Sequence, residues 1–192
     1  MSQRVVLKNV RLSFPKLFEA TQFQQGQGKA RYDASFLVVP GSDNDKAILA
    51  AIREECKTAF GAKADAKLKA LQNDSGKFCY QDGNTKEYEG YEDHFFLSSH
   101  RNEEQGPPKV VDKDKTPLTP ADGKPYAGCY VNASVDIWAQ SGQYPGIRCT
   151  LIAVQFCADG DAFAGAPATD EDFEDLSDPD EDGDDDMGDL VG

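Results

Sequence analysis

The sequence predicts a small, mostly antiparallel β-barrel with one main helix, followed by an acidic C-terminal tail. Three observations lead to this prediction. Several apolar segments alternate with polar residues at a period of two, as half-buried strands do. Turns that contain glycine or proline separate these segments. Acidic residues crowd the end of the 192-residue chain. This combination is typical of one barrel domain with an appendage.

Charge divides the chain into two parts. Residues 1–168 carry all 20 basic residues and 21 acidic ones, whereas residues 169–192 carry 13 acidic residues and no basic one. Repulsion among closely spaced carboxylates, together with few branched apolar side chains, predicts disorder. We therefore expect a folded domain over residues 1–165 and a disordered acidic tail over residues 166–192. The net charge of −14 then says little about what the folded part binds.

Two strands are predicted near the start of the chain. Residues 5–14 are rich in branched and apolar side chains and should form a strand that ends at Pro15. Residues 30–39 form the next one. In that strand Tyr32 and Arg31 lie on opposite faces, so both cannot line one groove unless a bulge intervenes.

The main helix is predicted directly after these strands. Ser42 is suited to accept the free N–H groups of a first turn, and apolar residues then recur at helical spacing up to Phe60. Gly61 is the predicted end of this helix. A weaker helix is expected over residues 64–71.

The second half of the chain alternates between loops and strands. Residues 73–93 form a polar, loop-rich segment, and a short strand follows over residues 94–99. A proline-rich, extended excursion covers residues 102–127. The clearest alternation lies at residues 128–139, and the last strand is expected over residues 147–157.

One face of the strand at residues 128–139 is a candidate binding surface. It carries Tyr130 and Trp138 with small polar residues between them, opposite an apolar face. Stacking a base on an aromatic ring is worth about 1–3 kcal/mol and does not depend on sequence, because every base has a π-face. In the alternative interpretation, both rings pack beneath other parts of the fold.

Aromatic residues also lie near cations at several other places. A protein that binds single strands needs this mixture, since cations track phosphates while rings take bases. The alternative is that the cations merely extend over a core. The candidates for base stacking are Tyr130, Trp138, Tyr32 and Tyr91. The candidates for phosphate contact are Arg11, Lys16, Arg31, Arg101, Lys109 and Arg148.

Composition argues against several other functions. No run of about 18 apolar residues is present, so no membrane-spanning helix is predicted, and we expect no secretory signal. The five cysteines include no Cys-x-x-Cys pair, which favours a reducing cytosol. With two histidines, the chain offers little for a metal site or a catalytic relay. We predict neither an enzyme nor a bound metal or cofactor.

Four segments carry a resemblance to a known family. They are Val10–Glu19, Tyr32–Pro40, Tyr88–Glu92 and Gly128–Val135, in an order and spacing that span most of residues 5–157. The sequence resembles phage-encoded single-stranded DNA-binding proteins. The resemblance implies an OB-type barrel that coats single strands during replication, recombination and repair. It also implies action in the cytoplasm of an infected bacterial cell.

The acidic tail is expected to act in two ways. A tethered polyanion can imitate a phosphate backbone and occupy a cationic groove when no nucleic acid is bound. The resemblance implies in addition that the tail recruits replication proteins, for which Phe173, Leu190 and Val191 are the candidate contacts. Two features depart from the family pattern. The tail ends without an aromatic residue, and the main helix comes earlier than in a plain OB fold, so we expect an elaborated barrel.

Two other functions fit parts of the same pattern. A protein-interaction module would use its acidic tail to mimic nucleic acid and capture a basic partner, and its folded part would not bind oligonucleotides. A nucleic-acid enzyme such as a nuclease would need clustered carboxylates and a metal ion, and a magnesium-dependent activity assay would reveal it.

Overall fold

The computed structural model describes residues 1–22, 26 and 28–163. The tail predicted over residues 166–192 lies outside these residues. The described part forms seven strands and two α-helices, joined by loops and short 3₁₀ turns. In chain order these elements are β1 (Gln3–Thr21), β2 (Arg31–Val38), α1 (Asp43–Phe60), α2 (Ala64–Gln72), β3 (Tyr80–Asp82), β4 (Phe95–Asn102), β5 (Lys109–Val111), β6 (Tyr130–Gln140) and β7 (Gly146–Ala158).

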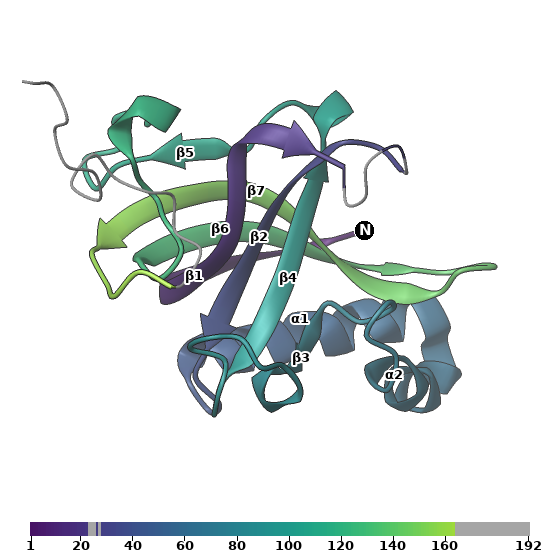
Figure 1. Ribbon diagram of the computed structural model, residues 1–192. Coiled ribbons are helices and arrows are strands. Elements are labelled where there is room, and N and C mark those ends of the chain that lie inside the picture. Colours follow the sequence, from purple (N-terminus) through teal and green to yellow (C-terminus); the bar gives the residue numbers. More distant parts are fainter. Residues whose placement is uncertain (23–25, 27, 164–192) are drawn as a thin grey trace, which may run out of the picture.

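The strands form one sheet that closes on itself. Their order is β3-β4-β2-β1-β6-β7-β5, and an additional parallel contact between His100 of β4 and Thr150 of β7 joins the two sides. Strands β1, β2, β4, β7 and β6 thus make a closed, mostly antiparallel barrel, and β3 and β5 extend it (Figure 1). The predicted fold class is confirmed. The main helix does follow the second barrel strand, and it runs across the lower end of the barrel in Figure 1.

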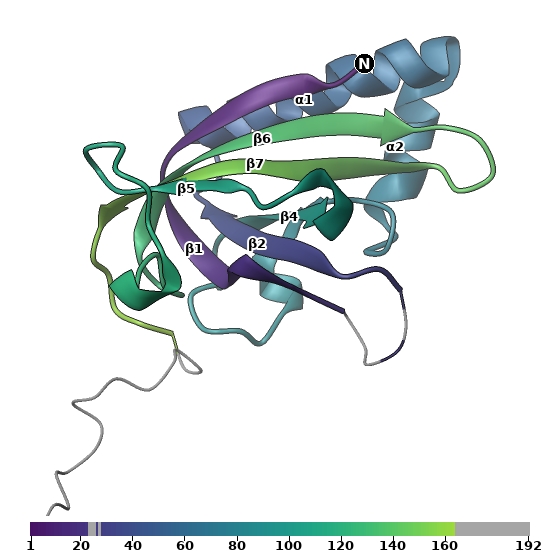
Figure 2. The ribbon, with the colours of Figure 1, turned by 90° about the horizontal axis from the view of Figure 1, so that it is seen from above.

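The predicted strand faces agree with the observed core. On β6, the residues Val131, Ala133, Val135 and Ile137 are each at most 2% exposed, while the residues between them are half-buried. Figure 2 shows β6 and β7 continuing together as a long hairpin that extends beyond the barrel. On α1, Ile48, Ile52 and Cys56 share the buried face. None of the helices in the described residues is long and apolar enough to cross a membrane.

Strand β1 continues past Pro15, where the sequence predicted its end. Proline lacks an N–H group and interrupts regular pairing. The chain accommodates it by a bulge, because the register with β2 shifts between Ser13 and Lys16 and Phe14 adopts a φ of 47°. This shift leaves the Phe14 side chain 52% exposed on the outside of the barrel.

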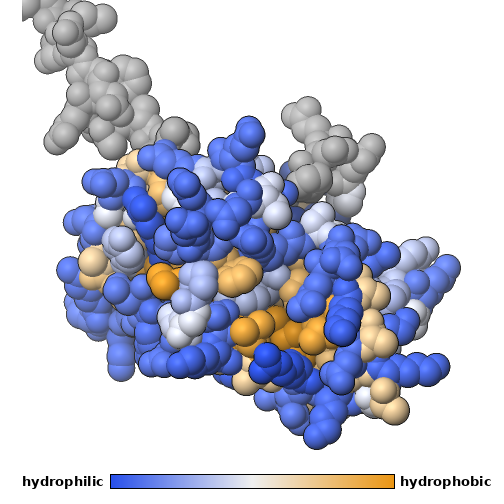
Figure 3. Space-filling view, turned by 90° about the horizontal axis from the view of Figure 1, so that it is seen from below, coloured by the Kyte–Doolittle hydropathy of each residue, from blue (hydrophilic) through white to orange (hydrophobic). Residues whose placement is uncertain are grey.

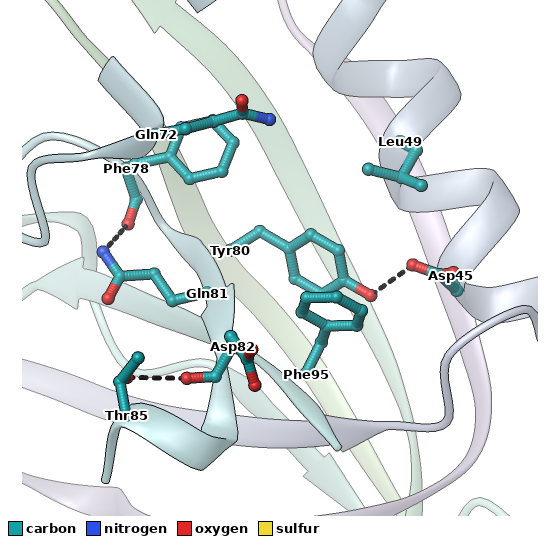
Figure 4. A pocket seen from close by; sticks show the side chains of 9 residues that line it. All are labelled: Asp45, Leu49, Gln72, Phe78, Tyr80, Gln81, Asp82, Thr85 and Phe95. Atoms are coloured by element: carbon teal, nitrogen blue, oxygen red, sulfur yellow. Dashed lines mark hydrogen bonds between the residues drawn. The ribbon is translucent and has the colours of Figure 1, made fainter. Parts of the chain in front are cut away.

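Strand β3 is anchored to the start of α1 through a buried hydrogen bond. The Tyr80 hydroxyl donates to Asp45 Oδ1 at 2.6 Å (Figure 4). The Gly41 N–H donates to the other carboxyl oxygen at 2.8 Å. The bond lies beside a hollow of about 300 Å³ between the helices and β3. Hydrophobic side chains gather on this lower side of the molecule (Figure 3).

Replacing Tyr80 with phenylalanine is expected to destabilise the fold by about 1–3 kcal/mol, because the buried Asp45 oxygen loses its donor. In a domain of this size, that change lowers the melting temperature by roughly 2–12 °C. Thermal denaturation followed by circular dichroism measures the effect. Tyr144→Phe is the matched control, since the Tyr144 residue is 67% exposed. Equal melting temperatures for the two variants would contradict the anchoring role.

Candidate nucleic-acid interface

The outer surface of β2, β4 and β7 carries an open row of polar and charged side chains. The β2–β4 register sets Arg31, Asp33 and Ser35 beside Asn102, His100 and Ser98, respectively, while the residues between them face the core. The His100–Thr150 contact continues the row onto β7. Strands that lie far apart in the sequence therefore supply one continuous surface.

A hollow of about 400 Å³ lies on this surface, and we call it the cationic hollow. Arg31, Lys86 and Arg148 line it from three different segments. Arg148 donates to the Gly76 carbonyl at 2.7 Å, which fixes its guanidinium at the wall of the hollow. Lys16 of β1 adds a further cation beside the hollow, because it lies opposite Asp33 in the β1–β2 register.

The neighbouring titratable groups leave this positive charge in place. Burial, together with the nearby positive charges of Arg31 and Arg148, lowers the pKa of His100 to about 4. The imidazole is therefore neutral at neutral pH. Arg31 forms an ion pair with Asp33 at 2.9 Å. Burial raises the pKa of Asp33, against the opposing effect of Arg31 and Lys16. The hollow thus contains several cations, and the carboxyl group of Asp33 lies beside it and pairs with Arg31.

A cluster of four aromatic rings adjoins the cationic hollow, and we call it the aromatic platform. Its members are Phe14, Tyr88, Tyr91 and Phe96. The ring centroids of Phe14 and Tyr88 are 4.9 Å apart, those of Tyr88 and Tyr91 are 5.3 Å apart, and those of Tyr91 and Phe96 are 5.1 Å apart. Phe96 also lines the hollow. Phe14 and Tyr88 are 52% and 50% exposed, so two rings are available beside a cationic surface.

Two of the predicted stacking residues are buried. Tyr32 faces the core of the barrel and is 8% exposed, whereas its neighbour Arg31 faces outward. Tyr91 is 1% exposed, and its hydroxyl donates to Ser13 Oγ at 3.0 Å. In this structure neither ring offers a face to a base, so burial corrects both assignments. Tyr91 instead supports the exposed rings of the platform.

The other two predicted stacking residues lie at opposite ends of β6. Trp138 pairs with Arg148 across the β6–β7 ladder, which places it beside the cationic hollow. Its indole N–H donates to Thr150 Oγ1 at 3.1 Å. Tyr130 lies at the other end of β6, where the segment after β7 packs against its ring at Gly160.

The predicted phosphate contacts divide into two groups. Lys16, Arg31 and Arg148 come together around the cationic hollow, as described above. Arg101 donates to the Gly106 and Gln105 carbonyls at 2.8 Å each, and Arg11 donates to the Gly128 and Asp161 carbonyls at 3.0 and 2.7 Å. Lys109 lies on β5, and β5 pairs with a part of β7 that follows the contact between β7 and β4. The last three are thus separate from the hollow.

Among the rings of the aromatic platform and the cations that line the cationic hollow, four residues were not sequence-based candidates. They are Phe14, Tyr88, Phe96 and Lys86. Phe14 had a signal in the sequence, since it precedes the proline that forces the bulge. Tyr88 and Lys86 belong to a polar loop, where nothing local distinguishes a residue that faces a groove. The predicted tail contacts Phe173, Leu190 and Val191 lie outside the described residues.

Trp138 allows a direct optical test of its position, because it is the only tryptophan in the chain. Its emission is expected to be quenched when a single-stranded oligonucleotide is added, since a base stacks on the ring or displaces water near it. Fluorescence titration measures this effect. Unchanged emission at saturating oligonucleotide would assign Trp138 a purely structural role.

Comparison with known proteins identifies the family of this chain. A family model described as the single-stranded DNA-binding protein of Enterobacter phage Enc34 matches residues 3–187. The chain belongs to this family. The putative protein p50 of Acyrthosiphon pisum secondary endosymbiont phage 1 is 42% identical over 178 residues, which cover 91% of this chain and 94% of that protein.

Solved structures show the same fold at lower identity. The Enc34 single-stranded DNA-binding protein in complex with single-stranded DNA is 23% identical, with a TM-score of 0.64 over 83% of this chain and 88% of that one. The single-stranded DNA-binding protein gp2.5 of bacteriophage T7 is 8% identical, with a TM-score of 0.52 over 90% and 93% of the two chains. The barrel is therefore shared with phage single-stranded DNA-binding proteins.

Proposed function

We propose that this protein binds single-stranded DNA, without sequence preference, along the aromatic platform and the cationic hollow. The observation that carries the proposal is their adjacency, since exposed Phe14 and Tyr88 lead through Phe96 into a hollow lined by three cations. Rings that stack bases and cations that neutralise phosphates are the two elements that such binding needs. The solved complex of the Enc34 relative with single-stranded DNA supports single-stranded DNA as the ligand.

We infer the cellular role from the family. The protein coats single strands during phage replication, recombination and repair in the cytoplasm of the infected cell, and it acts without catalysis. Residues 1–165 form the binding domain, and residues 166–192 form an acidic tail that competes with DNA for the cationic hollow. The tail also recruits replication proteins, and Phe173, Leu190 and Val191 are its candidate contacts.

A titration of the full chain with matched single- and double-stranded oligonucleotides tests the proposal. The comparison protein is a full-length neutral-tail chain, in which the 13 acidic residues of residues 169–192 become Asn or Gln. Both chains are expected to prefer single strands, and the neutral-tail chain binds more tightly, most strongly at low salt. The slope of log affinity against log salt concentration should be roughly −0.7 for each phosphate contact.

Three results of this titration would contradict parts of the proposal. If neither chain binds single strands at about 50 mM salt, the binding proposal fails and the protein-interaction alternative gains support. Equal affinities for the two chains would end the idea that the tail competes for the site, while leaving DNA binding by the barrel intact. Magnesium-dependent loss of the oligonucleotide would indicate a nuclease instead.

A further inference from the structure

The segment that follows β7 folds back onto the barrel and ends at the aromatic platform. Phe163 is 6% exposed and packs in one cluster with Leu37, Tyr91 and Phe96. Its N–H donates to the Ala127 carbonyl at 3.0 Å. Tyr91 and Phe96 are the buried members of the platform, so Phe163 supports the same rings that carry the exposed Phe14 and Tyr88.

Two glycines make room for this segment. A Cβ atom on Gly90 would lie 2.6 Å from the Phe163 ring, and one on Gly128 would overlap the Asp161 carbonyl. Both glycines also have positive φ, at 83° and 101°. Larger residues at these positions would face both a steric clash and backbone strain. Residues 159–163 therefore fit closely against a complementary site on the barrel, which we call the seat.

Arg11 holds the segment in this seat. Its guanidinium donates to the Gly128 carbonyl on the barrel side and to the Asp161 carbonyl on the segment side, at 3.0 and 2.7 Å. The same guanidinium lies 4.3 Å from the centroid of the Phe163 ring, within the range of a cation–π contact. One cation therefore bridges the barrel, the segment and the ring at its end.

We propose that residues 159–163 form a clamp that fixes the starting point of the acidic tail beside the DNA-binding surface, with Arg11 and Phe163 as its positioning residues. The first acidic residue after the clamp is Asp170, seven positions beyond Phe163. An extended chain of that length spans at most about 25 Å. The clamp therefore holds the first carboxylates of the tail within this distance of the platform, which sets the effective concentration of the competing polyanion.

This inference rests on the proposed competition between tail and DNA, and one ratio tests both. The tail-inhibition factor is the dissociation constant for a single-stranded oligonucleotide of the native-tail chain divided by that of the neutral-tail chain. We expect a factor well above one for the otherwise unchanged protein. Phe163→Ala and Arg11→Gln, each made in both full-length backgrounds, should lower the factor by about twofold. Release of the clamp moves the fixed point from Phe163 back to Ala158, and effective concentration falls roughly as the −3/2 power of tether length.

The ratio separates the clamp from other roles of these residues. Any effect of a variant on the platform itself occurs in both backgrounds and cancels. Lys109→Gln is the matched control for loss of one positive charge, and it should leave the factor unchanged. If Phe163→Ala proves too unstable, Phe163→Leu replaces it, because leucine keeps an apolar side chain in the seat. Phe163→Leu should lower the tail-inhibition factor less than Arg11→Gln does.

Three outcomes would overturn the inference. A factor that stays the same in Phe163 and Arg11 variants, while exceeding one in the unchanged protein, rejects the clamp and leaves tail competition standing. A factor of one in the unchanged protein rejects tail competition and the clamp together, but not DNA binding. If Lys109→Gln lowers the factor as much as Arg11→Gln does, the fall comes from the change in net charge and not from loss of the clamp.

Discussion

Replacing both Phe14 and Tyr88 with alanine is expected to weaken binding of single-stranded DNA by at least about thirtyfold. Each exposed ring that stacks a base contributes about 1–3 kcal/mol, so two rings contribute at least about 2 kcal/mol. The two side chains are about half exposed, and their loss should leave the core beneath them intact. Fluorescence anisotropy with a labelled oligonucleotide measures the change.

Conservative replacements are the control for this experiment. Phe14→Tyr and Tyr88→Phe keep the ring and should bind within about twofold of the unchanged protein, because stacking depends on the ring and not on the hydroxyl. The neutral-tail background removes any contribution of the tail. If the double alanine variant binds as tightly as the unchanged protein, the aromatic platform is not the site of base stacking.

Replacing Arg31 and Arg148 together with glutamine is expected to reduce the salt dependence of binding. Each cation that meets a phosphate contributes roughly 0.7 to the slope of log affinity against log salt, so the double variant should lose about 1.4. The two residues line the same hollow from β2 and β7, which places them on one path for the backbone of the strand. Titrations at several salt concentrations give the slope.

Two controls make this result specific. Lys109→Gln removes an exposed cation on β5, outside the hollow, and should leave the slope unchanged. Arg31→Lys and Arg148→Lys keep the charge and should restore most of the slope, although Lys cannot reproduce the hydrogen bond to Gly76 with the same geometry. A double glutamine variant with the slope of the unchanged protein would place the phosphate path elsewhere.

Phe14 and Arg11 show how closely the site depends on tertiary structure. The bulge at Pro15 turns Phe14 out of the barrel, and the loop that contains Tyr88 folds against it. Arg11 has the charge and position of a phosphate contact in the sequence, yet its donors are engaged by carbonyls of segments more than 100 residues away. No pattern near Arg11 indicates either partner.

The sequence by itself determined the main helix, most of the strands with their faces, and the division into a nearly neutral barrel and an acidic tail. These properties depend on alternation, helical spacing and charge density, which are local and can be read along the chain. It also placed Lys16, Arg31, Arg148 and Trp138 among the candidates that the fold brings around one hollow. It missed β3, which lies in a segment predicted as loop, and the continuation of β1 past Pro15.

Only the tertiary structure decided which aromatic rings are exposed and which cations remain available to a ligand. Tyr91 lies in a polar loop and still becomes buried, because Ser13, Leu37 and Phe163 surround it from three distant segments. Closing the barrel through β4 and β7 creates the hollow, and the segment after β7 engages Arg11. The burial of a side chain depends on the sum of its neighbours in space, and long-range pairing sets those neighbours.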